Sequence, residues 1–213
     1  MKFAVKPVRK NKFLPVELAL LIGLAAALLV GAKALQTQEV MAEKVVRLHV
    51  LANSDSEEDQ ALKLRVRDRV LARATELLEA SADRREAEGL LRGDLLEIER
   101  IAAEEITAAG YDYSVTAELT NTDFPTKEYD GFSLPAGNYL ALRVVIGEGK
   151  GQNWWCVVFP PLCTAAASDV PASALAAGFS EEEIALITEE NEGYVLKFKA
   201  VEWWEALRAK WEA

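Results

Sequence analysis

Alternating apolar and polar positions predict a body built from strands and helices. Residues 45–52 place apolar side chains at every second position, which is typical of a strand with a buried face. Residues 111–120 and 139–146 alternate in a similar way. Residues 154–159 are apolar at every position, so this strand must be covered on both faces. We predict that residues 147–153 join the last two strands as a β-hairpin.

Two amphipathic segments between the first and second strands predict an antiparallel helical hairpin. The first segment has an apolar residue at every third or fourth position from Leu62, and its helix ends near Ala80. Asp83 can cap the second helix, which runs to about Ala109. Gly110 then ends this helix, as a glycine just after a helix commonly does.

Three arginines share one face of the first helix. Arg65, Arg69 and Arg73 are spaced four residues apart and form a basic ridge in an acidic chain. Pairing with nearby acids such as Asp68 and Glu76 is favoured, because such pairs are common on helix surfaces. A docking role for the ridge stays open as the alternative.

The remaining segments carry weaker patterns. Residues 121–138 are predicted to form a long loop, and a long loop in a small domain is usually functional. Ser180 and the acids after it predict a short helix that ends near Gly193. Residues 194–199 are typical of an edge strand protected by lysines, and residues 201–211 of a closing helix.

These elements predict an α+β fold. We expect a single compact domain with a small, mostly antiparallel sheet, a helical hairpin after the first strand and a C-terminal helix. An N-terminal signal or anchor helix precedes it. The predicted boundaries are residues 1–35 for the signal peptide or membrane anchor, 36–44 for a linker, and 45–213 for the domain.

The N-terminal segment has the layout of a secretory signal. Its first twelve residues carry five bases and no acid, and residues 18–32 carry no charge. An Ala-x-Ala cleavage motif ends at Ala34, which would leave Leu35 as the first residue after the cut. A retained anchor stays open, because the apolar stretch with its flanks nearly reaches the ~20 residues of a membrane span. With either outcome, we expect the body to act outside the cytoplasm.

The charge of the chain excludes two classes of partner. The net charge is −10, and the body alone is more acidic because the first 34 residues hold more bases than acids. Such a body is repelled by nucleic acids and by anionic lipid surfaces. A protein or a basic partner is therefore expected, with membrane contact only through the N-terminal segment.

Two polar segments have both a structural and a ligand-binding interpretation. In residues 53–59, two serines are each followed three positions later by an acid, which favours a helix cap. The alternating acids also resemble a calcium loop, but its glycine at position six and acid at position twelve are missing. The Gly-x-Gly-x-Gly of residues 147–151 leads into a strand and lacks Gly-Lys-Ser/Thr, which argues against phosphate binding. We predict no metal ion and no cofactor.

The chain has two cysteines and one histidine. In an exported chain Cys156 and Cys163 can form a disulfide, and two buried free thiols are an equally good interpretation. A Cys–His hydrolase would use His49 with one of these cysteines. The apolar strand around the cysteines argues against it, because a reactive thiolate is usually stabilised at a helix N-terminus. We predict no catalytic residues.

Four blocks of residues between positions 45 and 163 form a specific combination. They are Arg47–Ser56 with Asp59–Asp68, Phe124–Lys127, Leu134–Tyr139 and Gly147–Cys163. In order and spacing, these blocks resemble the stage II sporulation protein R family of endospore-forming bacteria. The last block, with Asn-Trp-Trp-Cys-Val-Val-Phe-Pro-Pro-Leu-Cys, is the most specific. After Cys163 no family motif is matched.

The resemblance implies an exported signalling protein and not an enzyme. Members of this family are made in the forespore and are sent across its membrane into the space between forespore and mother cell. There they activate a membrane-embedded aspartyl protease of the mother cell, which cleaves the inactive precursor of sigma-E. The implied partners are this protease and the export machinery. The competing interpretations are an extracytoplasmic binding or wall-associated module, or the Cys–His hydrolase.

We expect the partner to contact three places in the body. These are the turn after the first strand, the segment that begins at Phe124, and the two ends of the strand predicted at residues 154–159, which we call the tryptophan strand. The candidate contact residues are Asn53, Ser54, Asp55, Phe124, Pro125, Thr126, Lys127, Asn153, Trp154, Trp155, Phe159, Pro160 and Pro161.

Overall fold

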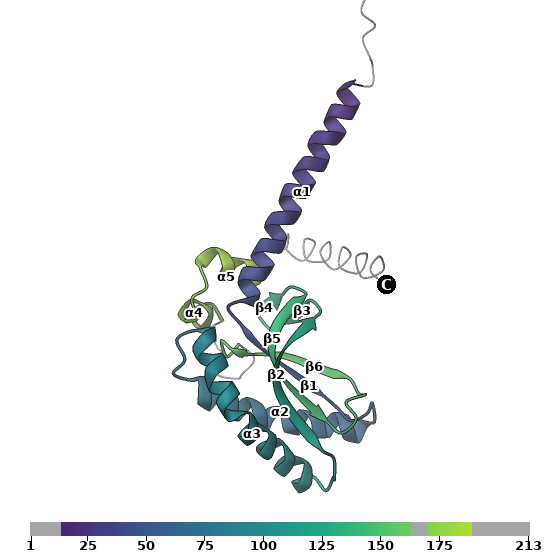
Figure 1. Cartoon of the computed structure of the whole chain (residues 1–213), viewed down its shortest axis with the longest axis vertical. Helices are drawn as coiled ribbons and strands as arrows, with labels where there is room; N and C mark the ends of the chain where they lie inside the picture. Colours follow the sequence, from purple (N-terminus) through teal and green to yellow (C-terminus); the bar gives the residue numbers. More distant parts are fainter. Residues whose placement is uncertain (1–13, 163–169, 189–213) are drawn as a thin grey trace, which may run out of the picture. The chain divides into compact units, whose positions relative to one another are not determined.

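A four-stranded mixed sheet organises the body of the protein (Figure 1). The computed structural model describes residues 14–162 and 170–188. The strand order is β2-β5-β1-β6; β1 runs parallel to β5 and antiparallel to β6, and β2 runs antiparallel to β5. The predicted α+β class is confirmed, although the central pairing is parallel. The strands are β1 Val46–Leu51, β2 Val115–Phe124, β5 Gly137–Ile146 and β6 Asn153–Phe159.

The predicted hairpin between β5 and β6 is wrong. These two strands follow each other in the sequence, but β1 lies between them and pairs with both. The connecting segment, Gly147–Gln152, which we call the glycine loop, therefore crosses over the C-terminal end of β1. Its backbone lies against the chain there: Lys150 N donates to Asn53 O at 3.2 Å and Gly151 N donates to Ala52 O at 3.0 Å. The glycines are needed because of this close crossing, and not because of a tight hairpin turn.

The predicted long loop at residues 121–138 is also wrong. β2 continues to Phe124, and two short strands, β3 Lys127–Tyr129 and β4 Phe132–Leu134, then pair as a second, two-stranded sheet. Gly131 has a φ of 79° at the turn between them, a backbone conformation that glycine adopts most readily. Strands of three residues are too short to produce a detectable alternation, which explains why the sequence pattern did not reveal them.

The predicted helical hairpin is confirmed. α2 spans Glu57–Leu78 and α3 spans Arg84–Ala108. Ser56 caps α2 by accepting a hydrogen bond from Asp59 N at 3.1 Å, so the cap interpretation of this turn is confirmed. Asp83 caps α3 in the same way. Both helices bury their apolar stripes against one face of the four-stranded sheet, where each fully buried leucine contributes about 1.5–3 kcal/mol.

The arginine ridge of α2 pairs with acids, but the main partners come from the neighbouring helix. Arg65 and Arg69 both lie within ion-pair distance of Glu105, and Arg73 forms a two-pronged contact with Asp94 at 2.8 Å. Of the predicted local partners, only Glu76 contacts the ridge, through Arg73 at 3.5 Å. The ridge therefore joins α2 to α3.

The second face of the sheet is covered by short elements from distant parts of the chain. They are the last turns of α1, the β3–β4 hairpin, α4 Val170–Ala176 and α5 Glu181–Ile187. A capping box of Ser180 and Glu183 begins α5, as predicted. Lys44 then holds this helix through an ion pair with Glu183 at 2.6 Å. The tryptophan strand is thus covered on both faces, as its composition requires. The predicted strand at residues 194–199 and helix at 201–211 lie outside the described residues.

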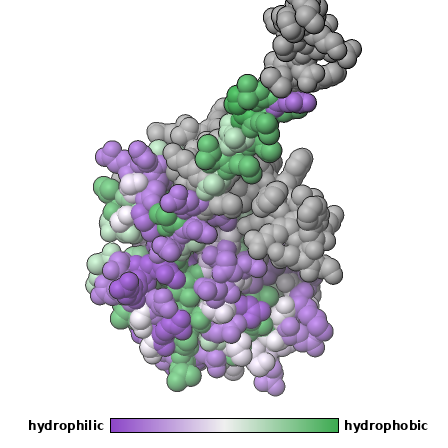
Figure 2. Space-filling model, turned by 45° about the horizontal axis from the view of Figure 1, so that its top comes forward, coloured by the Kyte–Doolittle hydropathy of each residue, from purple (hydrophilic) through white to green (hydrophobic). Residues whose placement is uncertain are grey.

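The N-terminal helix, α1, spans Leu14–Ala42 and belongs to two units of the chain. In the unit up to Thr37, the leucines between positions 18 and 29 are exposed, and the coloured part of this helix in Figure 2 is mostly green, meaning apolar. In the unit from Gln38 onward, Met41 is fully buried, although residues 36–44 were predicted as a linker. Among the residues that the structure describes, no helix is long and apolar enough to cross a membrane.

A Gly151→Ala substitution should destabilise the fold. A Cβ at this position would collide with the carbonyl oxygen of Ser54 and with the side chain of Ala52. Because backbone must move to relieve this contact, we expect a loss of about 1–3 kcal/mol in the free energy of unfolding. Gly93→Ala is the matched control: a Cβ at Gly93 in α3 meets nothing within 4 Å, and the change should stabilise by about 0.5–1 kcal/mol. Urea unfolding measures the change in the free energy of unfolding for both variants. Equal changes in the two variants would contradict the close crossing at Gly151.

Candidate functional site

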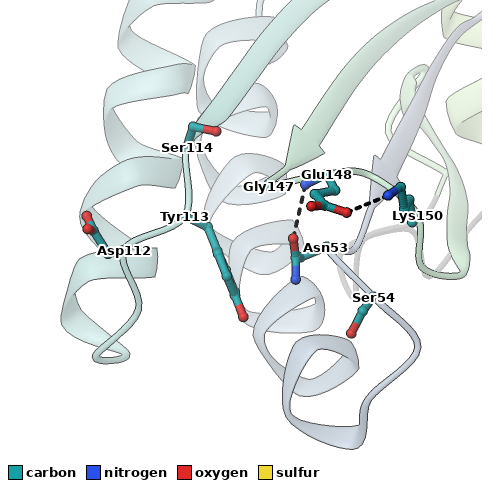
Figure 3. A pocket seen from close by; sticks show the side chains of 8 residues that line it. All are labelled: Asn53, Ser54, Asp112, Tyr113, Ser114, Gly147, Glu148 and Lys150. Carbon is teal, nitrogen blue, oxygen red and sulfur yellow. Dashed lines mark hydrogen bonds and ion pairs between the residues drawn. The ribbon is translucent and has the colours of Figure 1, made fainter.

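The polar turn after β1 and the glycine loop hold each other in place. Asn53 Oδ1 accepts from Glu148 N at 3.0 Å, and Asp55 Oδ1 accepts from Gln152 N at 2.8 Å. A hollow of about 570 Å³ lies beside this contact. Figure 3 shows it between the turn, the loop and the chain that enters β2; its lining residues are Asn53, Ser54, Asp112, Tyr113, Ser114, Gly147, Glu148 and Lys150.

Asp59 is the buried centre of this turn. Its carboxylate accepts from Ser54 Oγ at 2.6 Å and from Asn53 Nδ2 at 2.8 Å, and Tyr113 also hydrogen-bonds to it. Burial alone would raise the pKa of Asp59, but these hydrogen bonds outweigh it and lower the pKa below its ordinary value. The predicted contact residues Asn53 and Ser54 therefore have a structural role in the turn.

A second hollow, of about 500 Å³, lies at the N-terminal end of β6. We call it the tryptophan groove. One wall comes from α2, the opposite wall comes from β3, and the beginning of β6 lies between them. The lining residues are Gln60, Lys63, Leu64, Lys127, Glu128, Tyr129, Gln152, Asn153, Trp154 and Trp155.

The two tryptophans of the groove point to opposite faces of the sheet, and both are half-buried. Trp155 stacks on the ring of His49 with 3.9 Å between centroids, and Phe124 meets it edge-on at 4.5 Å. On the other face, the guanidinium of Arg67 lies 4.1 Å from the ring centre of Trp154. The indole Nε1 of Trp154 is buried without a hydrogen-bond partner. Each ring is thus packed against neighbouring side chains, Trp155 against His49 and Phe124, and Trp154 against Arg67.

A buried guanidinium lies behind the groove. Arg47, in the central strand, is 0% exposed, and its Nη2 donates to Tyr129 Oη at 2.6 Å while its Nε donates to Cys156 O at 3.1 Å. The rings of Phe124 and Tyr139 lie 4.1 and 4.8 Å from its guanidinium carbon. Its Nη1 is buried without a partner. Burial lowers the pKa of Arg47 below its ordinary value, although the two tyrosines act in the opposite direction.

His49 and Cys156 cannot act together as a hydrolase. His49 lies on the face of Trp155, and its Nε2 hydrogen-bonds to Asn153 Oδ1 at 2.6 Å. Cys156 packs on the opposite face, among the residues that α2 and α3 cover, and it is disulfide-bonded. Burial also lowers the pKa of His49, which favours the neutral ring. The Cys–His alternative is therefore wrong for Cys156, and Cys163 lies outside the described residues.

The structure brings only some of the predicted contact residues together. Lys127, Asn153, Trp154 and Trp155 meet in the tryptophan groove. Phe124 is buried in the core, where it supports Trp155. Elsewhere in the body, Pro125 is exposed, Thr126 accepts from Ala136 N, and Asp55 holds the glycine loop. Phe159, Pro160 and Pro161 line a third hollow of about 330 Å³ between α2 and α4.

Sequence reasoning missed several residues of the groove. Lys63 is 4% exposed, although it is a lysine beside the apolar stripe of α2. Arg47 is a charged residue inside a strand that otherwise reads as buried. A charge inside a strand whose other residues are mostly apolar is rare, so Arg47 carried a detectable signal, whereas Lys63 lies beside the exposed Leu64 and carried none.

The described residues contain no group of three or more His, Cys, Asp or Glu side chains placed to hold a metal ion. The groove itself is lined by two indole rings, amide side chains and cations. Large aromatic rings of this kind are enriched where proteins bind one another.

Comparison with known proteins points to one family. A family model described as stage II sporulation protein R matches residues 42–169, which include the whole sheet and the groove. A protein of Bacillus subtilis (strain 168) with the name "Stage II sporulation protein R" is 41% identical over 124 residues. The match covers 58% of this chain and 55% of that protein, so the chain spans about half the length of this relative. No solved structure is significantly similar to the chain.

Asp59→Asn should flatten the acid dependence of stability. Because the folded pKa of Asp59 lies below its ordinary value of 3.8, its ionised form contributes stability above that pH, and the contribution is lost as pH falls through the folded pKa. At pH 7 the variant should lose about 1.5–3 kcal/mol, the contribution typical of hydrogen bonds to a charged group. Urea unfolding at pH 7, 5, 4 and 3 measures both effects. A constant difference across this series would show that Asp59 does not titrate as described.

Arg47→Lys should destabilise more than Arg47→Met. Lysine keeps a buried charge but cannot donate in two fixed directions, to Tyr129 and to Cys156 O, so we expect a loss of about 2–4 kcal/mol. Methionine has a similar length and removes the desolvation of the charge, so its loss should be smaller. Thermal unfolding ranks the two variants. A more stable lysine variant would mean that positive charge itself stabilises this position.

Proposed function

The chain belongs to the stage II sporulation protein R family, and we propose that it is an exported signalling protein that activates another protein by binding. The proposed partner is the membrane-embedded aspartyl protease of the mother cell, which matures the sigma-E precursor. Residues 1–35 direct the chain across the forespore membrane, and the body acts in the space between forespore and mother cell. The chain itself makes and breaks no bonds in this process.

The tryptophan groove is the observation that carries this proposal. Its lining contains two half-buried tryptophans and two lysines, in a chain whose net charge is −10. All residues of the groove lie within the part of the chain that the family model matches. Such a surface suits a protein partner, because tryptophan and tyrosine side chains are among those that contribute most of the binding energy in many protein interfaces. The bonded state of Cys156 supports action in an oxidising compartment.

Activation by binding requires a difference in affinity. A ligand shifts the equilibrium between the inactive and active forms of a protease only as far as it binds the active form more tightly. We propose that the chain binds the active form preferentially. This account needs no chemical group from the chain, and it leaves proteolysis to the aspartates of the protease.

Co-expression in a bacterium that does not sporulate tests the proposal. Cells that make this chain, the protease and the sigma-E precursor should accumulate mature sigma-E, whereas cells without this chain should not. The matched control lacks residues 2–35, which keeps the body in the cytoplasm and should also give no maturation. Immunoblots of the precursor measure the result. Maturation without the chain, or with the cytoplasmic control, would contradict activation from outside the cytoplasm.

A further inference from the structure

We propose that the tryptophan groove receives an extended, acidic segment of the partner protein. This inference rests on the proposed function for the identity of the partner, which is the protease, and it assigns the surface and the chemistry of the contact. The groove is favoured over the other two hollows by the charges around it, by the strand edge at its base and by its rigid aromatic floor.

Two lysines of the groove, Lys63 and Lys127, form no ion pair with an acid in the described part of the chain. Lys63 Nζ donates to Gln60 Oε1 at 2.6 Å and to Gln152 O at 2.9 Å, and both acceptors are neutral. Every ion pair in the described part of the chain uses a cation other than Lys63 or Lys127. A buried or half-buried cation is normally paired, since its desolvation is otherwise not offset. Lys63 is only 4% exposed and its charge interacts with that of Asp55, so the half-buried Lys127 is the lysine that can meet a carboxylate supplied from outside.

The floor of the groove adds positive charge from behind. Tyr129 lines the groove, and its hydroxyl accepts from the buried guanidinium of Arg47. Arg67 lies over the ring of Trp154, but its charge is balanced by an ion pair with Asp68 at 2.7 Å. The lining itself holds two lysines, Lys63 and Lys127, against one acid, Glu128. In a protein with a net charge of −10, such a local excess of positive charge attracts and orients an acidic segment.

The base of the groove is a strand edge. Among the described strands, β6 has one neighbour, β1, and Asn153–Trp155 form the end of β6 that lines the groove. An extended peptide can lie beside such an edge and bond to its backbone, while alternate side chains enter the flanking walls. This geometry favours an extended segment over a helix.

The hollow of Figure 3 lacks these features. Its lysine, Lys150, is already paired with Glu148 at 2.7 Å, and its Asn53 holds the glycine loop. It therefore offers no unpaired cation to a carboxylate. This difference makes Lys150 a matched control for Lys127, because both are lysines in the lining of a hollow and their replacement changes the net charge equally.

Charge reversal in the co-expression host tests the groove. At equal chain levels, Lys127→Glu should lower the matured fraction of the sigma-E precursor at least fivefold, whereas Lys150→Glu should retain at least half of it. Glu128→Lys, which makes the groove more positive, should keep or raise the fraction. Thermal unfolding followed by circular dichroism checks that the variants are folded. Equal effects of the two lysine variants would overturn the proposal.

A photo-crosslinking residue at position 152 gives a second measurement that does not depend on maturation. The backbone of Gln152 makes its contacts with Asp55 and Lys63, so its side chain can be replaced. Irradiation should join the chain to an acidic segment of the protease, and Lys127→Glu should reduce the yield at least fivefold. A crosslink to residues 189–213 of the same chain, or to a second copy of the chain, would overturn the proposal.

The two proposals fail in different ways. If the wild-type chain does not support maturation, the proposed function is wrong. If it does, but neither Lys127→Glu nor position 152 responds as expected, only the groove is wrong. A crosslink to a segment of the protease without acidic residues would likewise overturn the assigned chemistry.

Discussion

The position of β1 between β5 and β6 is the constraint on which the rest of the structure depends. Strands that follow each other in the sequence usually pair, but β5 and β6 are separated by β1, the first strand of the body. The glycine loop must therefore cross the end of β1, where Gly151 has no room for a side chain. The same crossing places the start of α2 against the loop. The beginning of β6 consequently lies between α2 and β3, and this arrangement forms the tryptophan groove.

The two faces of β1 differ in a way that links the core to this groove. Leu48 and Val50 face the helices and contribute to the larger core. On the opposite face, Arg47 and His49 hold Tyr129 and Trp155, which line the groove. Buried polar residues stabilise a fold less than apolar residues of the same size, so their presence in a central strand indicates another role. Positioning the aromatic floor of the groove is a role that fits their contacts.

Local sequence patterns were sufficient to predict the helices α2 and α3 and the central strand β1. The apolar stripes, the cap at Ser56 and the glycine after α3 all depend on neighbours within a few residues, which a sequence displays directly. The strand order was missed because it depends on contacts between residues far apart. The β3–β4 hairpin was missed because its strands are short. The groove was found in part: its tryptophans were visible as an unusual pair, while Lys63 and Arg47 gained their meaning only from surrounding burial.

The central place of β1 also affects when the sheet can form. Arg47 pairs with Ala141 and Leu48 with Cys156, so the first strand to leave a ribosome or a translocation channel waits about a hundred residues for its neighbours. Contacts this distant in sequence form slowly, because a long segment must first be closed. Until Phe159 has emerged, β6 cannot complete the sheet, although the helical hairpin and the β3–β4 hairpin can form from local contacts. A topology of this kind delays folding of the sheet, and such a delay is compatible with the proposed export, in which the chain would cross a membrane unfolded.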